Sequence, residues 1–327
     1  MEILVTGATG GVGAELLATL TDLESVSAVG TSRSGGGRVA TWDLVEPPPP
    51  ALDRHWDVVV HAAASTRWSM SQDEAIAANI LPTENLLQAV EADRFIYLST
   101  AHATGWHDSV ESSDLADYRN TYEWSKAWCE RLVRERPGSI VVRFPIVFGR
   151  RSDGAIARYG GMFKVIPAIA SGLVPAIVGV GDAPFDLVAV DELCAAIAHV
   201  ATTGDTPLVR IGCGAVAPTV DQVVDVAIDA LNEWRLARGL EPTVRPPLLD
   251  PERWHRFLLP FASEHLSPLQ QRSIEIFSEF EPYFCMERPF AVDLPLPYAE
   301  EAVVNTVLRW ADGHPRAASR SQVPWRP

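Results

Sequence analysis

Residues 3–13 read ILVTGATGGVG, and this stretch decides the fold. It starts with an apolar run typical of a buried strand and ends where a helix is predicted to begin. Gly7 allows a tight turn, Gly10 lets the backbone approach a pyrophosphate, and Gly13 lets the helix pack on the strand. The first helical turn then presents free N–H groups to phosphate, whereas outside this context the glycines would indicate only a turn. The residues expected to bind a dinucleotide here are Gly7, Thr9, Gly10, Gly11, Val12 and Gly13.

Apolar runs alternate with helical patterns through the first 150 residues. Strands are predicted at residues 3–5, 26–31, 39–43, 58–61, 95–98 and 140–143, and helices at 13–20, 74–92 and 121–135. Continuous apolar strands joined by helical crossovers are typical of a parallel sheet that is buried on both faces. The handedness of such crossovers favours an α/β fold with a doubly wound sheet of the Rossmann type.

The pattern changes after Gly149. Further strands are predicted at residues 185–190 and 208–212 with a helix at 191–201 between them, and helices dominate from residue 217 onward. We therefore predict a cofactor domain (residues 1–155 and 183–212) and a smaller, mainly helical substrate lobe (156–182 and 213–327). Many aromatic residues gather in 233–293, which we expect to cover the active-site cleft; the alternative is a packing layer that does not touch substrate. The tail from Gly313 is expected to be frayed.

The composition limits which compartment and which partners are expected for this protein. Of the 327 residues 47% are hydrophobic, and the net charge is −15, so nucleic acid and anionic membranes are not expected as partners. No apolar run approaches the ~18 residues of a membrane span, and the first one is too short for a signal peptide. We therefore expect a cytoplasmic protein. No metal site is expected, because the four cysteines lack metal-ligand spacing; they are Cys129, Cys194, Cys213 and Cys285.

The end of the second predicted strand indicates which cofactor binds. In NAD-specific folds an acidic residue here binds the ribose 2′-hydroxyl, whereas an arginine accommodates the 2′-phosphate of NADP. Residues 26–40 contain no Asp or Glu, and Ser32 and Arg33 lie at this position, with Arg38 close by. We therefore expect NADP(H), with NAD(H) as the second option; the alternative for Arg33 is a solvated surface residue. Two further contacts, expected near the adenine, are Asp43 and Leu44.

Tyr122 and Lys126 are the candidate catalytic pair. At positions i and i+4 of a helix they share a face. A tyrosine has an unperturbed pKa of about 10, and a nearby ammonium would lower it, so that the phenol can deliver a proton to a carbonyl oxygen. Thr100, at the end of the fifth strand, could hydrogen-bond the same oxygen. The spacing alone would suit a solvated helical pair, but here it follows the glycine turn and the strand-end hydroxyl in order.

Together these motifs resemble the extended short-chain dehydrogenase/reductases. The matching segments are 6–13, 43–44, 61–64, Asn79, 98–100, 122–126, 143–145 and 186–192. The resemblance implies that residues 61–64 line the cofactor cleft and that Pro145 starts a loop beside the nicotinamide. The cofactor contacts that it implies are His61, Ala62, Ala63, Asn79, Tyr122, Lys126, Phe144, Pro145 and Val147.

Residues 120–130 and 142–149 look like the thioester-reductase and fatty acyl-CoA reductase branch of that family. This resemblance implies NADPH-dependent reduction of an activated acyl group or an aldehyde, on a small-molecule substrate linked to a carrier or to CoA, and a homodimer is a further expectation. One alternative is an NAD-dependent nucleotide-sugar epimerase or dehydratase, with Arg245, Arg253 and Arg256 on the diphosphate. Another is a non-enzymatic NADP-sensing regulator, against which the Tyr–Lys pair argues.

Overall fold

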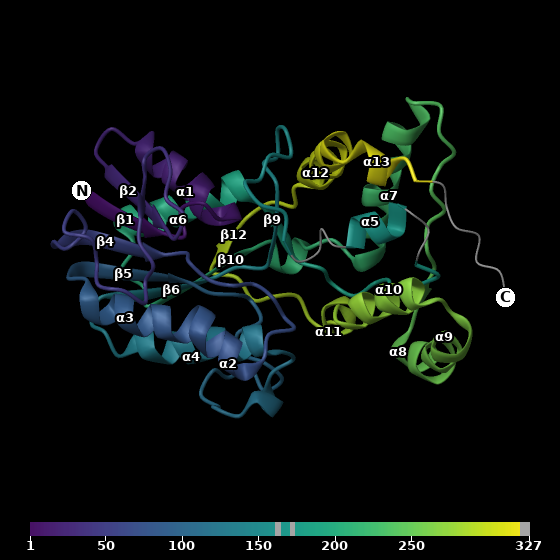
Figure 1. Ribbon diagram of the computed structural model, residues 1–327, viewed down its shortest axis with the longest axis horizontal. Coiled ribbons are helices and arrows are strands. Elements are labelled where there is room, and N and C mark those ends of the chain that lie inside the picture. Colours follow the sequence, from purple (N-terminus) through teal and green to yellow (C-terminus); the bar gives the residue numbers. More distant parts are fainter. Residues whose placement is uncertain (161–164, 171–173, 321–327) are drawn as a thin grey trace.

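The computed structural model describes residues 1–160, 165–170 and 174–320. A parallel sheet with helices on both faces forms one half of the protein, and a helical lobe forms the other (Figure 1). The eight strands follow the order β12-β10-β6-β5-β4-β1-β2-β3, with every neighbouring pair parallel. They are β1 (Glu2–Thr6), β2 (Ser27–Ser32), β3 (Val39–Thr41), β4 (Trp56–His61), β5 (Ala92–Leu98), β6 (Ser139–Arg143), β10 (Leu208–Gly212) and β12 (Leu294–Pro295). The predicted doubly wound sheet is confirmed.

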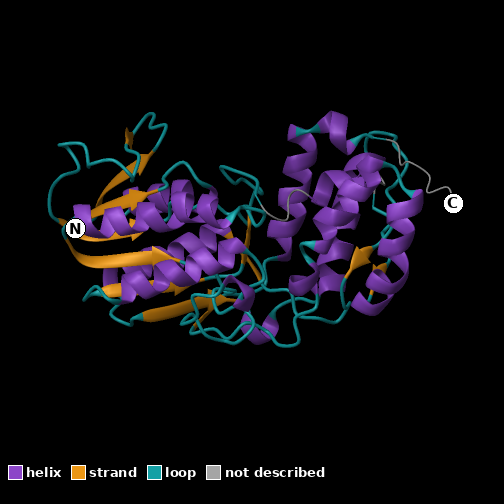
Figure 2. Ribbon diagram, turned by 60° about the horizontal axis from the view of Figure 1, so that its bottom comes forward, coloured by secondary structure: helices purple, strands orange, loops and turns teal. Residues whose placement is uncertain are grey.

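Helices bury both faces of the sheet (Figures 1 and 2). On one face α1 (Gly11–Thr21) packs beside α6 (Val190–Thr203), and on the other lie α3 (Leu81–Ala89) and α4 (Thr121–Arg134). Successive residues of a strand point to opposite faces, so Leu4 and Val5 belong to different core clusters although both are fully buried. Burial on both faces explains why these strands read as continuous apolar runs.

The prediction of one long helix over residues 74–92 is wrong in detail. The helical segment is divided into α2 (Gln72–Ala75), a π-helical turn η1 (Ile76–Ile80) and α3, and β5 already begins at Ala92. Pro82 explains part of this, because it has no N–H to bond the carbonyl four residues earlier. The wider π turn accommodates that defect, and it holds the buried Asn79 at its C-terminal side.

The lobe is built from short segments and a few long helices. Its elements, with those that link it to the sheet, are β7 (Ile146–Phe148), α5 (Val165–Ala170), β8 (Ile177–Val178), β9 (Leu187–Ala189), η4 (Gly214–Val216), α7 (Val220–Leu236), β11 (Leu248–Leu249), α8 (Pro251–Arg253), η5 (Trp254–Leu258), α9 (Leu259–His265), α10 (Pro268–Ser278), α11 (Glu281–Phe284), α12 (Glu300–Gly313) and α13 (Pro315–Ala318). β7 pairs with β9, and β8 with β11. β12 leaves the lobe and extends the sheet edge. Among the described residues, no helix has both the length and the apolar character that crossing a membrane requires.

The tail is ordered further than expected. α12 continues to Gly313, α13 follows, and the Ala318 side chain is fully buried. The guanidinium of Arg235 donates to the carbonyl oxygens of Ala318, at 2.5 Å, and Arg320, at 3.2 Å. The expectation of fraying is therefore wrong for residues 313–320, because these contacts fix the backbone; residues 321–327, and residues 161–164 and 171–173 of the predicted lobe, lie outside the described part.

Candidate active site

The glycine turn between β1 and α1 is closely packed. Gly7 has a φ of +68°, and a Cβ there would lie 2.6 Å from the backbone nitrogen of Ala63. A Cβ on Gly13 would lie 2.2 Å from the carbonyl oxygen of Gly7. None of the described side chains caps α1, whose N-cap is Gly10, so its first-turn N–H groups are available to an anion. This cradle fits the pyrophosphate of a dinucleotide, with Ala62 and Ala63 as the neighbouring wall.

The end of β2 carries the groups expected to select the cofactor. The Ser32 hydroxyl accepts a hydrogen bond from the Gly35 amide at 3.1 Å, which holds the following glycine loop against the strand end. Arg33 is exposed and forms no ion pair with any residue that the structure describes. Asp43 is also exposed, whereas the Leu44 side chain is buried. The Arg33 guanidinium is therefore accessible at the end of β2, and its binding to a cofactor phosphate stays a prediction.

α4 carries the candidate pair, Tyr122 and Lys126, at the carboxyl ends of the central strands. Asn120 caps the helix by accepting from the Glu123 amide at 3.0 Å. The Lys126 ammonium donates to the carbonyl oxygen of Leu98 at 2.6 Å and lies 4.4 Å from the ring centroid of Tyr97. The Thr100 hydroxyl acts on the Tyr122 phenol and lowers its pKa. Thr100, Tyr122 and Lys126 therefore lie together at the end of β5, and their catalytic role stays a prediction.

The protonation of this pair differs from the expectation. Burial, and then the charge of Glu123, raise the pKa of Tyr122 above its usual value, although the Thr100 hydroxyl lowers it. Burial lowers the pKa of Lys126 to about 8. The expected lowering of the tyrosine pKa by the lysine is wrong for this geometry, because the ammonium is directed at Leu98. A phenol with a raised pKa keeps its proton, which suits a proton donor.

His61 and Asn79 lie behind the site rather than on its surface. Both ring nitrogens of His61 are used, Nδ1 with the Thr6 hydroxyl at 2.7 Å and Nε2 with the Thr83 hydroxyl at 3.0 Å. Burial, and then the charge of Lys126, lower its pKa to about 3, so the ring is neutral. The Asn79 amide accepts from the Ser65 backbone at 2.7 Å and donates to the Ser125 hydroxyl at 2.9 Å.

The two side chains were expected at the cofactor. Each is only 1% exposed and fully engaged with the protein, so that expectation is wrong for the side chains. They position the neighbouring loop instead.

The segment after β6 runs along the edge where the cofactor is expected. The carbonyl oxygen of Phe144 accepts from the Ala101 amide at 2.9 Å, directly after Thr100. Val147 continues in β7 and pairs with Val188 of β9. Phe144, Pro145 and Val147 therefore lie in the segment next to the end of β5, and their contact with the nicotinamide stays a prediction.

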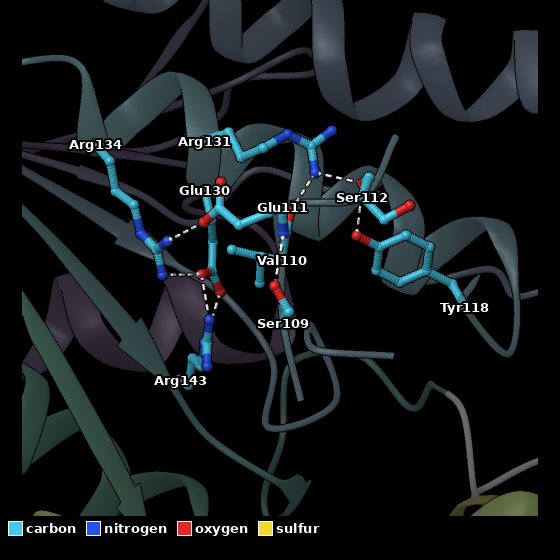
Figure 3. A network of polar contacts seen from close by, with 9 residues as sticks. All are labelled: Ser109, Val110, Glu111, Ser112, Tyr118, Glu130, Arg131, Arg134 and Arg143. Atoms are coloured by element: carbon cyan, nitrogen blue, oxygen red, sulfur yellow. Dashed lines mark hydrogen bonds and ion pairs between the residues drawn. The ribbon is translucent and has the colours of Figure 1, made fainter. Parts of the chain in front are cut away.

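A buried ion pair between Glu130 and Arg143 fixes α4 to the sheet (Figure 3). The Glu130 carboxylate, which is fully buried, accepts from Arg143 at 2.8 and 2.6 Å. It also accepts from the Ser99 hydroxyl at 2.6 Å. Arg134, which is partly exposed, adds an ion pair to the Glu130 carboxylate at 3.3 Å. Ser99 and Thr100 thus have different roles, since Ser99 is directed to Glu130 and Thr100 to the site. On the same helix Arg131 donates to the carbonyls of the loop before α4.

The lobe contributes a residue that the sequence analysis did not single out. Tyr283 of α11 donates its hydroxyl to the Glu123 carboxylate at 2.5 Å and accepts from the Asn120 side chain at 2.7 Å. Its ring stacks on Trp68 at 4.5 Å and meets His102 edge-on at 4.7 Å. The signal in the sequence that pointed to this region was the aromatic-rich segment 233–293. Several of its aromatic residues pack the lobe core instead, namely Trp254, Phe277, Phe280 and Phe284.

The family model described as NAD dependent epimerase/dehydratase matches residues 3–212, from the first strand through the last long strand of the sheet. The chain belongs to this family. It is therefore an NAD(P)-dependent enzyme of the short-chain dehydrogenase/reductase type, and its cofactor is a nicotinamide dinucleotide. The glycine turn, the strand-end hydroxyl and the Tyr–Lys pair all lie within the matched region.

Individual relatives differ in what they do. The chain is 29% identical over 174 residues to the dTDP-6-deoxy-L-talose 4-dehydrogenase (NAD(P)(+)) of Kitasatospora kifunensis, a match that spans 47% of this chain and 54%, about half, of that protein. The fold of the present chain is similar to that of the terminal R domain from the myxalamid PKS-NRPS biosynthetic pathway. The TM-score is 0.72 at 18% identity, and the match covers 98% of this chain and 92% of the R domain. The present chain is also similar to an NAD dependent NDP-hexosamine 5,6-dehydratase of tunicamycin biosynthesis, with TM-score 0.61, 17% identity and 95% and 98% covered. At these identities the structural likenesses show the fold alone.

Proposed function

We propose that this member of the family is an NADPH-dependent reductase of an acyl thioester or aldehyde with an apolar acyl part. The observation that carries the proposal is an aromatic cluster at the start of α4, where Tyr283 of the lobe packs against Trp68 and His102 of the sheet half. The cation at this cluster, Arg119, is already paired with Glu123. Aromatic rings bind apolar surface, whereas a nucleotide sugar needs donors for its diphosphate. The expectation that Arg33 accommodates a 2′-phosphate supports NADPH over NADH.

The arginines considered for a diphosphate are already paired. The pairs are Arg245 with Asp221 and Asp225, Arg253 with Asp250, and Arg256 with Glu252. A diphosphate would have to displace these carboxylates. The sequence similarity to a dTDP-sugar dehydrogenase still favours a nucleotide-sugar enzyme as the second candidate.

The site residues divide the chemistry between them. When bound, the nicotinamide supplies a hydride to the carbonyl carbon. Tyr122 donates its proton to the carbonyl oxygen, and the Thr100 hydroxyl hydrogen-bonds the same oxygen as charge develops. Lys126, whose ammonium donates to the Leu98 carbonyl oxygen, would position the ribose of the bound cofactor. With a thioester, the resulting thiohemiacetal releases the thiol and leaves an aldehyde.

One experiment tests the proposal. The purified protein is incubated with NADPH or NADH and with acyl-CoA thioesters, aldehydes or nucleotide sugars, while the absorbance of the reduced nicotinamide is followed. Steady consumption of NADPH with a thioester or an aldehyde is the expected result. Conversion of a nucleotide sugar without net consumption would establish the second candidate instead. Stoichiometric NADPH binding without turnover of any compound would favour the regulator.

A further inference from the structure

The helical lobe contains an apolar cavity of about 70 Å³. All the side chains that line it are apolar; they include Phe148, Ile177, Ala227, Leu231, Phe277 and Phe284. The volume would hold water, which needs roughly 10–15 Å³ per molecule, but water also needs polar partners, and these side chains offer none. Interiors are normally packed without voids of this size, so the cavity suits an apolar occupant.

A continuous series of aromatic rings connects the cavity with the catalytic helix. Phe284, in the cavity wall, stacks on Phe280 at 5.9 Å, and Phe280 contacts Trp68 at 4.7 Å. Trp68 stacks on Tyr283, with the ring centroids 4.5 Å apart. The Tyr283 hydroxyl donates to the carboxylate of Glu123, which follows Tyr122 in the sequence. Trp68 is also tied to α4 directly, since the Thr121 hydroxyl donates to its carbonyl oxygen at 3.2 Å.

We propose that the lobe cavity binds the aliphatic chain of the acyl substrate, whose carbonyl carbon lies at Tyr122. This inference rests on the proposed reductase function and names the part of the substrate that the lobe recognises. The rings between the two sites are packed against one another, so the surface that would border the chain between the cavity and α4 is apolar. A sugar or a nucleotide does not suit this cavity, because its hydroxyl or phosphate groups would lose their hydrogen bonds to water without replacement.

The test compares straight-chain acyl-CoA thioesters from acetyl to lauroyl. Each methylene buried in the cavity is expected to raise kcat/KM about fourfold, which corresponds to ~0.8 kcal/mol, until the cavity is full. Ala227→Phe fills the cavity from α7 and is expected to abolish this gain while acetyl-CoA is reduced as before. Val226→Phe is the matched control, because Val226 lies next to Ala227 but does not line the cavity. Unchanged chain-length dependence in Ala227→Phe would overturn the inference.

A binding measurement separates this inference from the reductase proposal. The fluorescent fatty acid cis-parinaric acid is titrated into the protein with NADP⁺, and it is displaced with fatty acids of increasing length. Saturable binding that Ala227→Phe abolishes and Val226→Phe keeps supports the cavity site even if no thioester or aldehyde is reduced. Reduction of thioesters without chain-length preference, and no saturable binding, would refute the cavity site while the reductase proposal stands. If Ala227→Phe does not fold, the variant Leu231→Ala is tested in its place. This substitution enlarges the cavity and must shift the preferred acyl chain to greater length.

Discussion

The Tyr283→Phe substitution removes one hydroxyl and keeps the ring that stacks on Trp68. That hydroxyl donates to the Glu123 carboxylate at 2.5 Å, and the carboxylate is also paired with Arg119 at 3.2 Å. Glu123 is fully buried, so no water replaces the lost bond. The Asn120 amide, 2.7 Å from the hydroxyl, loses its acceptor at the same time. The variant therefore isolates the contact by which the lobe holds the start of the catalytic helix.

The loss in unfolding free energy expected for Tyr283→Phe follows from the charge of the acceptor, the Glu123 carboxylate. A hydrogen bond to a charged group contributes about 1.5–3 kcal/mol, and a neutral one about 0.5–1.5 kcal/mol. Tyr118→Phe is the matched control, since the Tyr118 hydroxyl donates at 2.8 Å to the neutral carbonyl of Ser112. Urea denaturation near neutral pH should give a loss in unfolding free energy for Tyr283→Phe about twice that of Tyr118→Phe.

The pH dependence gives the sharper test. Burial raises the pKa of Glu123 above its ordinary value of 4.5, while Arg119 and then Tyr283 oppose the rise. A raised carboxyl pKa contributes stability that is present below pH 4.5 and is lost as the pH rises through the folded-state value. Without the Tyr283 hydroxyl the pKa rises further, so Tyr283→Phe should destabilise most near neutral pH and little below pH 4.5. An equal loss at both pH values, or one no greater than that of Tyr118→Phe, would refute the reasoning.

Four further substitutions test the rest of the site. Tyr122→Phe should abolish turnover and leave the cofactor Kd nearly unchanged, as measured by fluorescence titration; retained turnover would exclude it as the proton donor. Arg33→Asp should weaken NADPH binding far more than NADH binding, and an equal effect on both would remove the argument for NADP. Arg143→Met leaves the Glu130 carboxylate buried without its main partner and should cost about 3–5 kcal/mol in urea denaturation. Arg134→Met, at the exposed partner, should cost less than about 1 kcal/mol, and equal costs would contradict this account.

The sequence alone determined the features that depend on local chemistry and periodicity. Apolar runs with helical crossovers predicted the parallel sheet, because buried strands must be apolar on both faces. Gly7 and Gly13 could be assigned, because only glycine tolerates the turn and the close backbone approach found there. Tyr122 and Lys126 could be paired because their spacing places them on one face of a helix, and the strand order then brings Thr100 to the same edge.

Only the tertiary structure decided what depends on contacts between distant segments and on burial. The partner of Glu123, Tyr283, lies 160 residues further along the chain, and no local pattern links the two. The pKa of Tyr122 rises rather than falls, because desolvation outweighs a lysine that the fold directs to the Leu98 carbonyl. His61 has both ring nitrogens bonded inside the protein, a role that its position at a strand end does not reveal. Side-chain type and spacing specify which groups can react, whereas packing sets their partners, their protonation and the space left for a substrate.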